Sequence, residues 1–184
     1  MNFPFRIELY KEGDYATIYT FRIEGEEISE LDRFLGDEVV RNSPDFHSLL
    51  DRLKRLTDEL GLYHPQSDFG ADRWFRDESN LRDHDDDACA LWAPIPVEDR
   101  RRLKKPYPSL RLYCFRLERM LIVGGGGVKR TQRPEDDPHL NRQLRALKYV
   151  MKRVKRRLSE GGLSIVEDGF ILEGDLEFES EPLS

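Results

Sequence analysis

Apolar and polar residues alternate along the start of the chain, as they do in β-strands that bury one face. Residues 3–24 contain two such alternating runs around a turn at Glu12, Gly13 and Asp14, and this pattern predicts a β-hairpin. The spacing then changes to that of an amphipathic helix over Ile28 to Val39. The first 42 residues therefore predict a hairpin followed by a short helix.

A second helix is predicted over Pro44 to Leu60, with Ser43 as its N-cap and Gly61 just beyond its end. Its apolar residues recur at helical spacing and form one stripe: Phe46, Leu49, Leu50, Leu53, Leu56 and Leu60. This stripe predicts that the helix covers one face of a sheet.

Strand patterns return at Ala88 to Ala93, Leu110 to Leu117 and Met120 to Val123. Only Glu118 and Arg119 separate the last two runs, and so short a turn requires antiparallel pairing because a parallel crossover needs many more residues. We therefore expect these three strands in one antiparallel sheet.

A long amphipathic helix is predicted from Leu140 to Leu158, ended by Gly161 and Gly162. The face opposite its apolar stripe carries Arg145, Lys148, Lys152 and Lys155. Alternation resumes around Asp168 and Gly169 and predicts a final hairpin.

These elements predict an α+β protein with one compact domain, since 184 residues fit one core better than two. Its expected parts are residues 1–42 with the hairpin and short helix, residues 43–160 with the central core and the basic helix, and residues 161–184 with an acidic hairpin.

Charge is distributed unevenly along the chain, although the net charge is only −6. Residues 100–157 hold 19 Lys and Arg against 4 Asp and Glu, a balance of +15 that leaves −21 elsewhere. Such cationic density favours phosphate backbones, although a charge run is often only a solvated helix face. No apolar run approaches the roughly 20 residues of a membrane span, and the first residues lack a signal-peptide pattern, so we expect a cytoplasmic protein without a membrane partner.

Cysteine and histidine offer little evidence for a reactive or metal site. Cys89 and Cys114 lie in apolar runs, which favours buried thiols over a disulfide or metal ligands. The histidines are dispersed, and the acidic run at residues 83–87 is typical of solvated charge rather than of a metal loop. We expect no metal.

Four consecutive glycines, Gly124 to Gly127, raise the question of a phosphate-binding loop. Such loops need Lys and Ser or Thr directly after the glycines, at the start of a helix. Here Val128 follows, and the chain runs through residues 132–138 before any helix can begin. The glycines instead predict a strand with a bulge or kink, where missing side chains allow close approach of backbone or ligand.

The stretch "LRLYCFRLERMLIVGGGGVKRTQRP" resembles the RelE/HigB superfamily of bacterial toxins, including its phage-derived branch. These proteins show an apolar strand with an Arg, a turn, a second apolar strand, a glycine and a basic exit toward a proline. Residues 110–117, 120–127 and 128–134 match these parts in order, and the resemblance covers about residues 43–158. It implies a RelE-like antiparallel sheet packed by helices, with the N- and C-terminal hairpins as additions.

The resemblance implies a toxin of a type II toxin–antitoxin system, a ribosome-dependent mRNA endoribonuclease that needs neither metal nor cofactor. Its partners are then mRNA, the ribosome and a cognate antitoxin protein. The implied catalytic residues are Arg111, Lys129, Arg130 and Tyr113, although a strand tyrosine such as Tyr113 is commonly part of the core.

The remaining cations of the basic segment are expected to contact the RNA backbone: Arg101, Arg102, Lys104, Lys105, Arg145, Lys148 and Lys152. The alternative function is a non-catalytic phage- or defence-related interaction module on the same scaffold. We also consider that the acidic C-terminal hairpin docks beside the basic helix face and mimics phosphate, against the simpler reading of an edge that is acidic for solubility.

Overall fold

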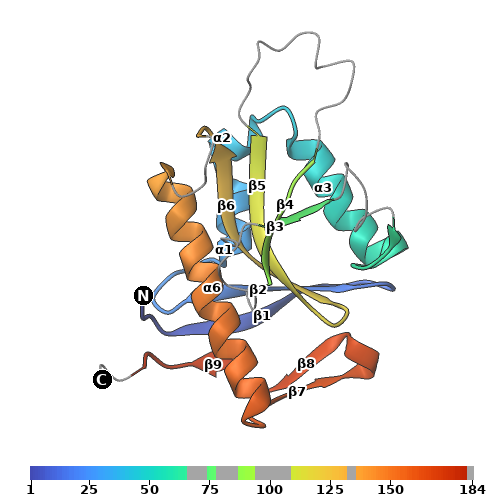
Figure 1. Cartoon of the computed structure of the whole chain (residues 1–184), viewed down its shortest axis with the longest axis vertical. Helices are drawn as coiled ribbons and strands as arrows, with labels where there is room; N and C mark the ends of the chain where they lie inside the picture. The colour runs from blue at the N-terminus through green and yellow to red at the C-terminus, as the bar shows by residue number, and fades with distance from the viewer. Residues whose placement is uncertain (66–73, 78–86, 94–108, 132–135, 182–184) are drawn as a thin grey trace.

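A seven-stranded sheet forms the centre of the computed structural model, which describes residues 1–65, 74–77, 87–93, 109–131 and 136–181 (Figure 1). The strand order is β3-β4-β5-β6-β2-β1-β9, and β7 and β8 form a separate two-stranded sheet. The strands are β1 (Phe5–Glu12), β2 (Thr17–Ile23), β3 (Phe75–Asp77), β4 (Ala88–Leu91), β5 (Ser109–Leu117), β6 (Met120–Lys129), β7 (Leu163–Val166), β8 (Ile171–Gly174) and β9 (Glu177–Phe178). The helices are α1 (Glu30–Gly36), α2 (Glu38–Arg41), α3 (Phe46–Arg55) with a π-helical turn η1 (Leu56–Leu60), and α6 (Pro138–Ser159), and a short 3₁₀ turn η3 (Glu167–Gly169) joins β7 to β8.

The predicted α+β class and the antiparallel pairing of β4, β5 and β6 are confirmed. The N-terminal hairpin also forms, but it is not an addition to the sheet. β2 pairs with β6 in parallel over Thr17–Thr20 and Met120–Val123, so the hairpin completes the main sheet. This pairing joins strands that are distant in sequence, which a local pattern does not encode.

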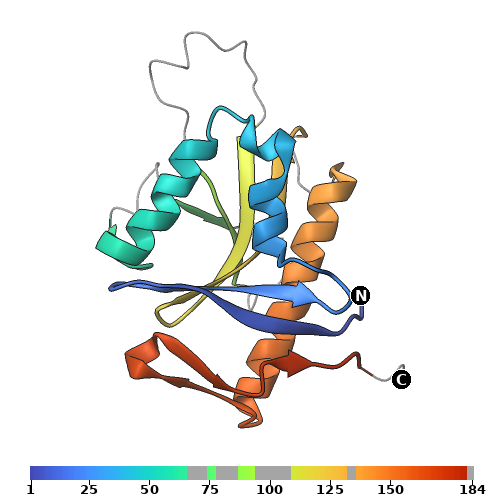
Figure 2. The same cartoon turned by 180° about the vertical axis from the view of Figure 1, so that it is seen from behind.

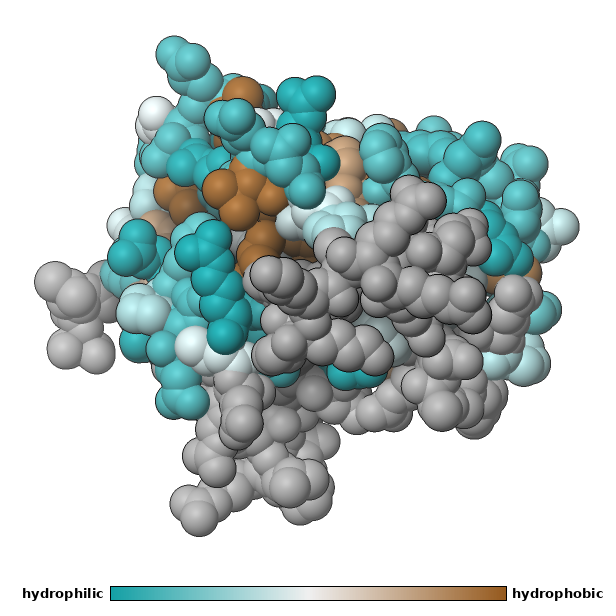
Figure 3. Space-filling view, turned by 90° about the horizontal axis from the view of Figure 1, so that it is seen from above, coloured by the Kyte–Doolittle hydropathy of each residue, from teal (hydrophilic) through white to brown (hydrophobic). Residues whose placement is uncertain are grey.

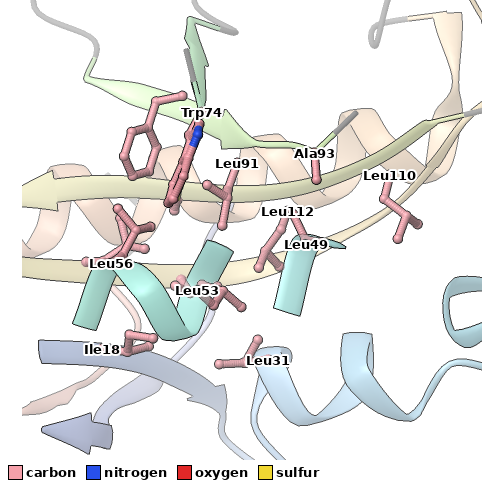
Figure 4. Packing of buried hydrophobic residues seen from close by; sticks show 14 of the residues in the cluster. Ile18, Leu31, Leu49, Leu53, Leu56, Trp74, Leu91, Ala93, Leu110 and Leu112 are labelled. Atoms are coloured by element: carbon pink, nitrogen blue, oxygen red, sulfur yellow. The ribbon is translucent and has the colours of Figure 1, made fainter. Parts of the chain in front are cut away.

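Helices cover both faces of the sheet, as Figures 1 and 2 show from opposite sides. One hydrophobic cluster lies between the sheet and α1 to α3 and includes Leu31, Leu49 and Leu112 (Figure 4). A second cluster lies between the other face and α6 and includes Phe21 and Leu147. As predicted, α3 covers one face through its apolar stripe.

The start of α3 differs from the expectation. Ser43 is not its N-cap: the helix begins at Phe46, and the Ser43 hydroxyl donates a hydrogen bond to the carbonyl of Val39. Asp45 occupies the cap position, but its carboxylate makes no capping bond and accepts one from the Leu110 N–H of β5, 2.8 Å away. β4 pairs with β5 only as far as Leu112 of β5. The Leu110 N–H therefore lies beyond the end of β4 and needs another acceptor.

The long helix α6 begins where its sequence signals lie. Asp137 caps it by accepting hydrogen bonds from the backbone N–H groups of His139 and Leu140, and Pro138 occupies the first turn. Beyond the helix, Gly161 adopts a left-handed conformation with φ of 80°. No helix among the described residues is both long and apolar enough to cross a bilayer.

The C-terminal hairpin forms as predicted, but the acidic chain does not lie on the basic face that we named. After β8 the chain adds β9 to the outer edge of β1 and then runs beside α6. There Glu181 pairs with Arg153 and Arg156, and Asp175 pairs with Arg157. Lys155 pairs instead with Asp87, far from the hairpin in sequence.

Cys89 and Cys114 are buried free thiols on neighbouring strands, as the sequence predicted. Their sulfur atoms lie 3.6 Å apart, and burial raises the pKa of Cys114.

Candidate functional site

The glycine run forms part of β6 and contains the predicted bulge. Cys114 of β5 pairs with Val123, whereas Leu112 pairs with Gly126. Gly124 and Gly125 thus lie opposite a single residue, Tyr113. A bulge of this kind bends the strand and changes the direction of its edge.

Each of these glycines lies where a side chain would meet another part of the molecule. A Cβ atom at Gly126 would overlap the backbone carbonyl of Arg111, and one at Gly125 would overlap the amide of Gln143 on α6. At Gly124 it would lie 3.2 Å from Leu147 of α6. The run therefore lets α6 pack directly on the backbone of β6.

A small polar cavity lies beside this bulge. β2 pairs with β6 only as far as Val123, so the β6 edge after it has no strand partner among the described residues. Residues of α1 and α6 approach each other there and enclose about 50 Å³, room for about one water molecule. Its polar lining includes Glu30 and Arg33 from α1, and His139 and Gln143 from α6.

Glu30 is an unusual residue for this position because it is a carboxylic acid with only 4% of its surface exposed. Its one ion-pair partner among the described residues is Arg33, with 3.7 Å between Nε and Oε1. Burial raises the pKa of Glu30, and Arg33 and His139 offset that rise only in part. A carboxyl with a raised pKa can act as a proton acceptor and donor closer to neutral pH than an exposed one.

His139 holds a defined orientation at the start of α6. Its Nε2 lies 3.0 Å from the carbonyl oxygen of Gly126. A carbonyl only accepts hydrogen bonds, so Nε2 carries a proton in this bond and Nδ1 is the ring nitrogen left for other contacts.

A larger cleft of about 260 Å³ adjoins the cavity and shares His139, Asp37 and Val40 with it. Arg130, which follows β6, and Asp137 also line the cleft. In Figure 1 the end of β6, α2 and the start of α6 lie at the upper end of the molecule, and a view from above shows an apolar hollow framed by hydrophilic side chains (Figure 3). Arg130, His139 and the buried Glu30 thus line the cleft and the cavity that adjoins it.

The predicted catalytic residues are only partly brought together. Arg111 and Tyr113 share one face of β5, as alternation predicts, but they are 4% and 0% exposed. The Arg111 guanidinium donates hydrogen bonds to Ser109 Oγ at 2.9 Å and to the Leu110 carbonyl at 3.0 Å. Tyr113 belongs to the core, which was the alternative for this residue.

Lys129 ends β6 opposite Ser109, on the face of the sheet that carries Arg111. Arg130 is exposed and lines the cleft with His139. Of the residues expected to bind RNA, Arg145 and Lys152 are exposed on α6 and Lys148 is half-buried, whereas Arg101, Arg102, Lys104 and Lys105 lie outside the described residues.

Another buried carboxyl, Asp45, lies on the α3 side of the sheet. One of its oxygens accepts from Leu110, and the other has no hydrogen-bond partner among the described residues. Burial raises the pKa of Asp45 as well. Its hydrogen bond to the Leu110 N–H indicates a structural link between α3 and β5.

Sequence patterns missed Glu30, His139 and Gln143. Glu30 looks like an ordinary acidic residue in a first helical turn, and His139 was one of several dispersed histidines. The only signal was the length of the glycine run, which indicated that something approaches the strand closely. Within the described ranges, no group of three or more His, Cys, Asp or Glu could hold a metal ion.

Comparisons with known proteins found no relative: no family model, no curated protein and no solved structure matches the chain.

Proposed function

We propose that the protein binds RNA and cleaves it as a metal-independent endoribonuclease of the RelE-like kind, acting on mRNA at the ribosome. The observation that carries the proposal is the cleft at the end of β6, where Arg130 and His139 adjoin the cavity of the buried Glu30. These are the groups that phosphodiester cleavage without a metal requires: a cation for phosphate and two residues that exchange protons.

The outer face of α6 supplies a surface for the RNA backbone. We call Arg142, Arg145 and Lys152 the cationic stripe. Arg142, Arg145 and Lys152 are exposed and form no ion pair within the described region. Unpaired cations in a row on one helix attract a phosphate backbone and release its counterions. Because the helix begins at the cleft, an RNA strand bound along the stripe is led to His139.

In the proposed reaction the 2′-hydroxyl attacks the adjacent phosphorus while the bond from phosphorus to the 5′-oxygen breaks. Glu30 accepts the proton of the 2′-hydroxyl, directly or through one water molecule. His139 donates a proton to the departing 5′-oxygen, and Arg130 stabilises the additional negative charge on the phosphorane. The products are a 2′,3′-cyclic phosphate and a 5′-hydroxyl.

A cleavage assay with purified ribosomes and mRNA tests the proposal. We expect the wild type to cut, and His139→Ala and Glu30→Gln to lose about 10²- to 10⁴-fold in rate, the usual contribution of a general acid or base. Lys54→Ala is the matched control, because Lys54 is an exposed cation on α3 that lines neither the cavity nor the cleft. Uncut mRNA with wild-type protein, or full activity of both variants, would overturn the proposal.

The second candidate is a non-catalytic interaction module, and the burial of Arg111 and Tyr113 favours it. A module of this kind needs neither proton transfer nor an open active site. It predicts that mRNA stays intact with ribosomes present, while the protein still binds a protein partner.

A further inference from the structure

The β1–β2 turn and the β7–β8 turn line an open acidic cleft at one side of the molecule, and the β5–β6 turn is bonded to both. Thr17 N–H donates to the Arg119 carbonyl, and Arg119 N–H donates to the Gly169 carbonyl, each at 3.0 Å. These bonds hold the β1–β2 turn, the β5–β6 turn and the β7–β8 turn together. The cleft has a volume of about 700 Å³, and its carboxylates are Glu12, Asp14, Glu167, Asp168 and Glu173.

All five carboxylates are exposed, and none forms an ion pair with a described residue. The lining contains no Lys or Arg. Like charges gathered in this way repel one another, and a cationic partner relieves that repulsion. The floor is partly apolar, with Phe170, Ile171 and Leu172. The guanidinium of Arg119 lies 5.0 Å from the centre of the Phe170 ring, and the rest of this apolar surface suits the aliphatic stems of Lys and Arg side chains.

Thr17 is an independent sign of a missing partner. It lines the cleft, is fully buried, and its hydroxyl has no hydrogen-bond partner among the described residues. Alternation along β2 directs it to the same face as Tyr19, whose hydroxyl accepts a hydrogen bond from the Leu172 N–H of the C-terminal hairpin. A buried hydroxyl without a partner costs free energy, and an ammonium or guanidinium donor would satisfy it.

The cations that match this cleft belong to the same chain but lie on the other side of the molecule. In Figures 1 and 2 the turns of the two hairpins share one side, and the N-terminal half of α6 lies on the opposite side. The acidic C-terminal segment that does reach α6 pairs with Arg153, Arg156 and Arg157, and none of the described acidic residues pairs with the cationic stripe. Stripe and cleft therefore do not meet within one molecule.

We infer that the acidic cleft of one molecule binds the cationic stripe of a second copy. The contact is heterologous, because it joins two different surfaces, and each added copy exposes a further cleft and a further stripe. Since charge supplies most of the attraction, the association weakens as salt shortens the Debye length from about 30 Å at 0.01 M to about 3 Å at 1 M.

The test is the mass of the full chain in solution, measured by light scattering after size exclusion. We expect species larger than a monomer at about 0.01 M salt and monomers at about 1 M. Two double variants are expected to be monomeric at both: Glu12→Lys with Glu173→Lys in the cleft, and Arg145→Glu with Lys152→Glu on the stripe. These positions avoid the left-handed residues Glu167 and Asp168, and circular dichroism confirms folding.

Mixing the two double variants provides the decisive measurement, because the cleft variant keeps an intact stripe and the stripe variant keeps an intact cleft. We expect the mixture to associate at low salt although neither variant does alone. Glu24→Lys with Glu27→Lys is the matched control, since it changes the net charge equally at exposed positions outside the cleft and should associate like the wild type. A wild type that stays monomeric at low salt, or a mixture that does not associate, would overturn the inference.

Discussion

Glu30 shows how a single buried carboxyl makes stability depend on pH. Burial raises its pKa above the ordinary value of 4.5, so the folded protein holds a proton at pH values where the unfolded chain has released it. Between these two pKa values the folded state binds more protons, and stability therefore falls as pH rises through that window. The raised pKa of Asp45 acts in the same direction.

Glu30→Gln removes this loss, because the amide is neutral at every pH. We expect the variant to melt at a higher temperature than the wild type at pH 7 to 8, and the two melting temperatures to converge as pH falls below about 4.5, where both side chains are neutral. Thermal melts across pH measure this. Two curves that stay parallel from pH 4 to 8 would show that Glu30 carries no raised pKa.

The glycines of β6 are expected to differ sharply from other glycines in their tolerance of alanine. Gly126→Ala forces a methyl group against the backbone carbonyl of Arg111, which cannot move away as a flexible side chain can. We expect it to lose roughly 1–3 kcal/mol or more of unfolding free energy. Gly36→Ala is the control, because nothing lies within 4 Å of its added Cβ and it lies in a helix, where alanine is preferred. Equal denaturation midpoints for the two variants would contradict the packing described here.

At the scale of elements, the short strand β9 stabilises more of the molecule than its length indicates. Phe178 is 2% exposed and stacks on Phe5 of β1 with ring centroids 4.5 Å apart. Leu163 and Leu172 of the preceding hairpin belong to the same core cluster. The C-terminal segment is thus part of the fold, and removing it after Gly162 would expose that cluster.

Phe178→Ala is expected to cost roughly 3–5 kcal/mol, the usual range for a buried phenylalanine. Chemical denaturation measures the loss. Glu179→Ala is the matched neighbour: its side chain is exposed, and the hydrogen bond from Arg153 goes to its backbone carbonyl, which the substitution keeps. A Phe178→Ala variant as stable as Glu179→Ala would mean that β9 is not docked.

At the scale of the whole molecule, the proposed RNA binding and the proposed self-association both depend on the cationic stripe. The cationic stripe is the expected RNA surface and also the surface that a second copy would cover. RNA and self-association therefore exclude each other at that surface.

Adding a single-stranded RNA oligonucleotide at low salt is expected to convert the larger species into complexes of one protein molecule with RNA. Light scattering follows the mass, and an uncharged oligonucleotide analogue with the same bases is the control, because it lacks the phosphates that compete. If RNA binds and the mass of the protein species does not fall, RNA and the second copy do not use the same stripe. If the RNA does not bind and the mass of the protein species stays unchanged, the result would count against the RNA proposal alone.

The sequence by itself determined most of the elements and their local signals. Alternation and helical spacing encode which side of an element is buried, and the turn at Glu118 and Arg119 specifies an antiparallel neighbour, so the hairpins, α3 and α6 could be predicted. The glycine run likewise indicated a bulge with a close approach, because only a missing side chain allows one.

Only the tertiary structure decided which elements meet. The parallel pairing of β2 with β6, the bond from Asp45 to Leu110, and the approach of Glu30 to His139 all join residues far apart in sequence. A periodic pattern states that a face is buried but not what covers it, and the choice among partners depends on how all the faces pack together. For the same reason the stripe and the acidic hairpin, close in sequence, lie apart in the molecule, because β9 holds the C-terminal segment against β1 and the last turns of α6.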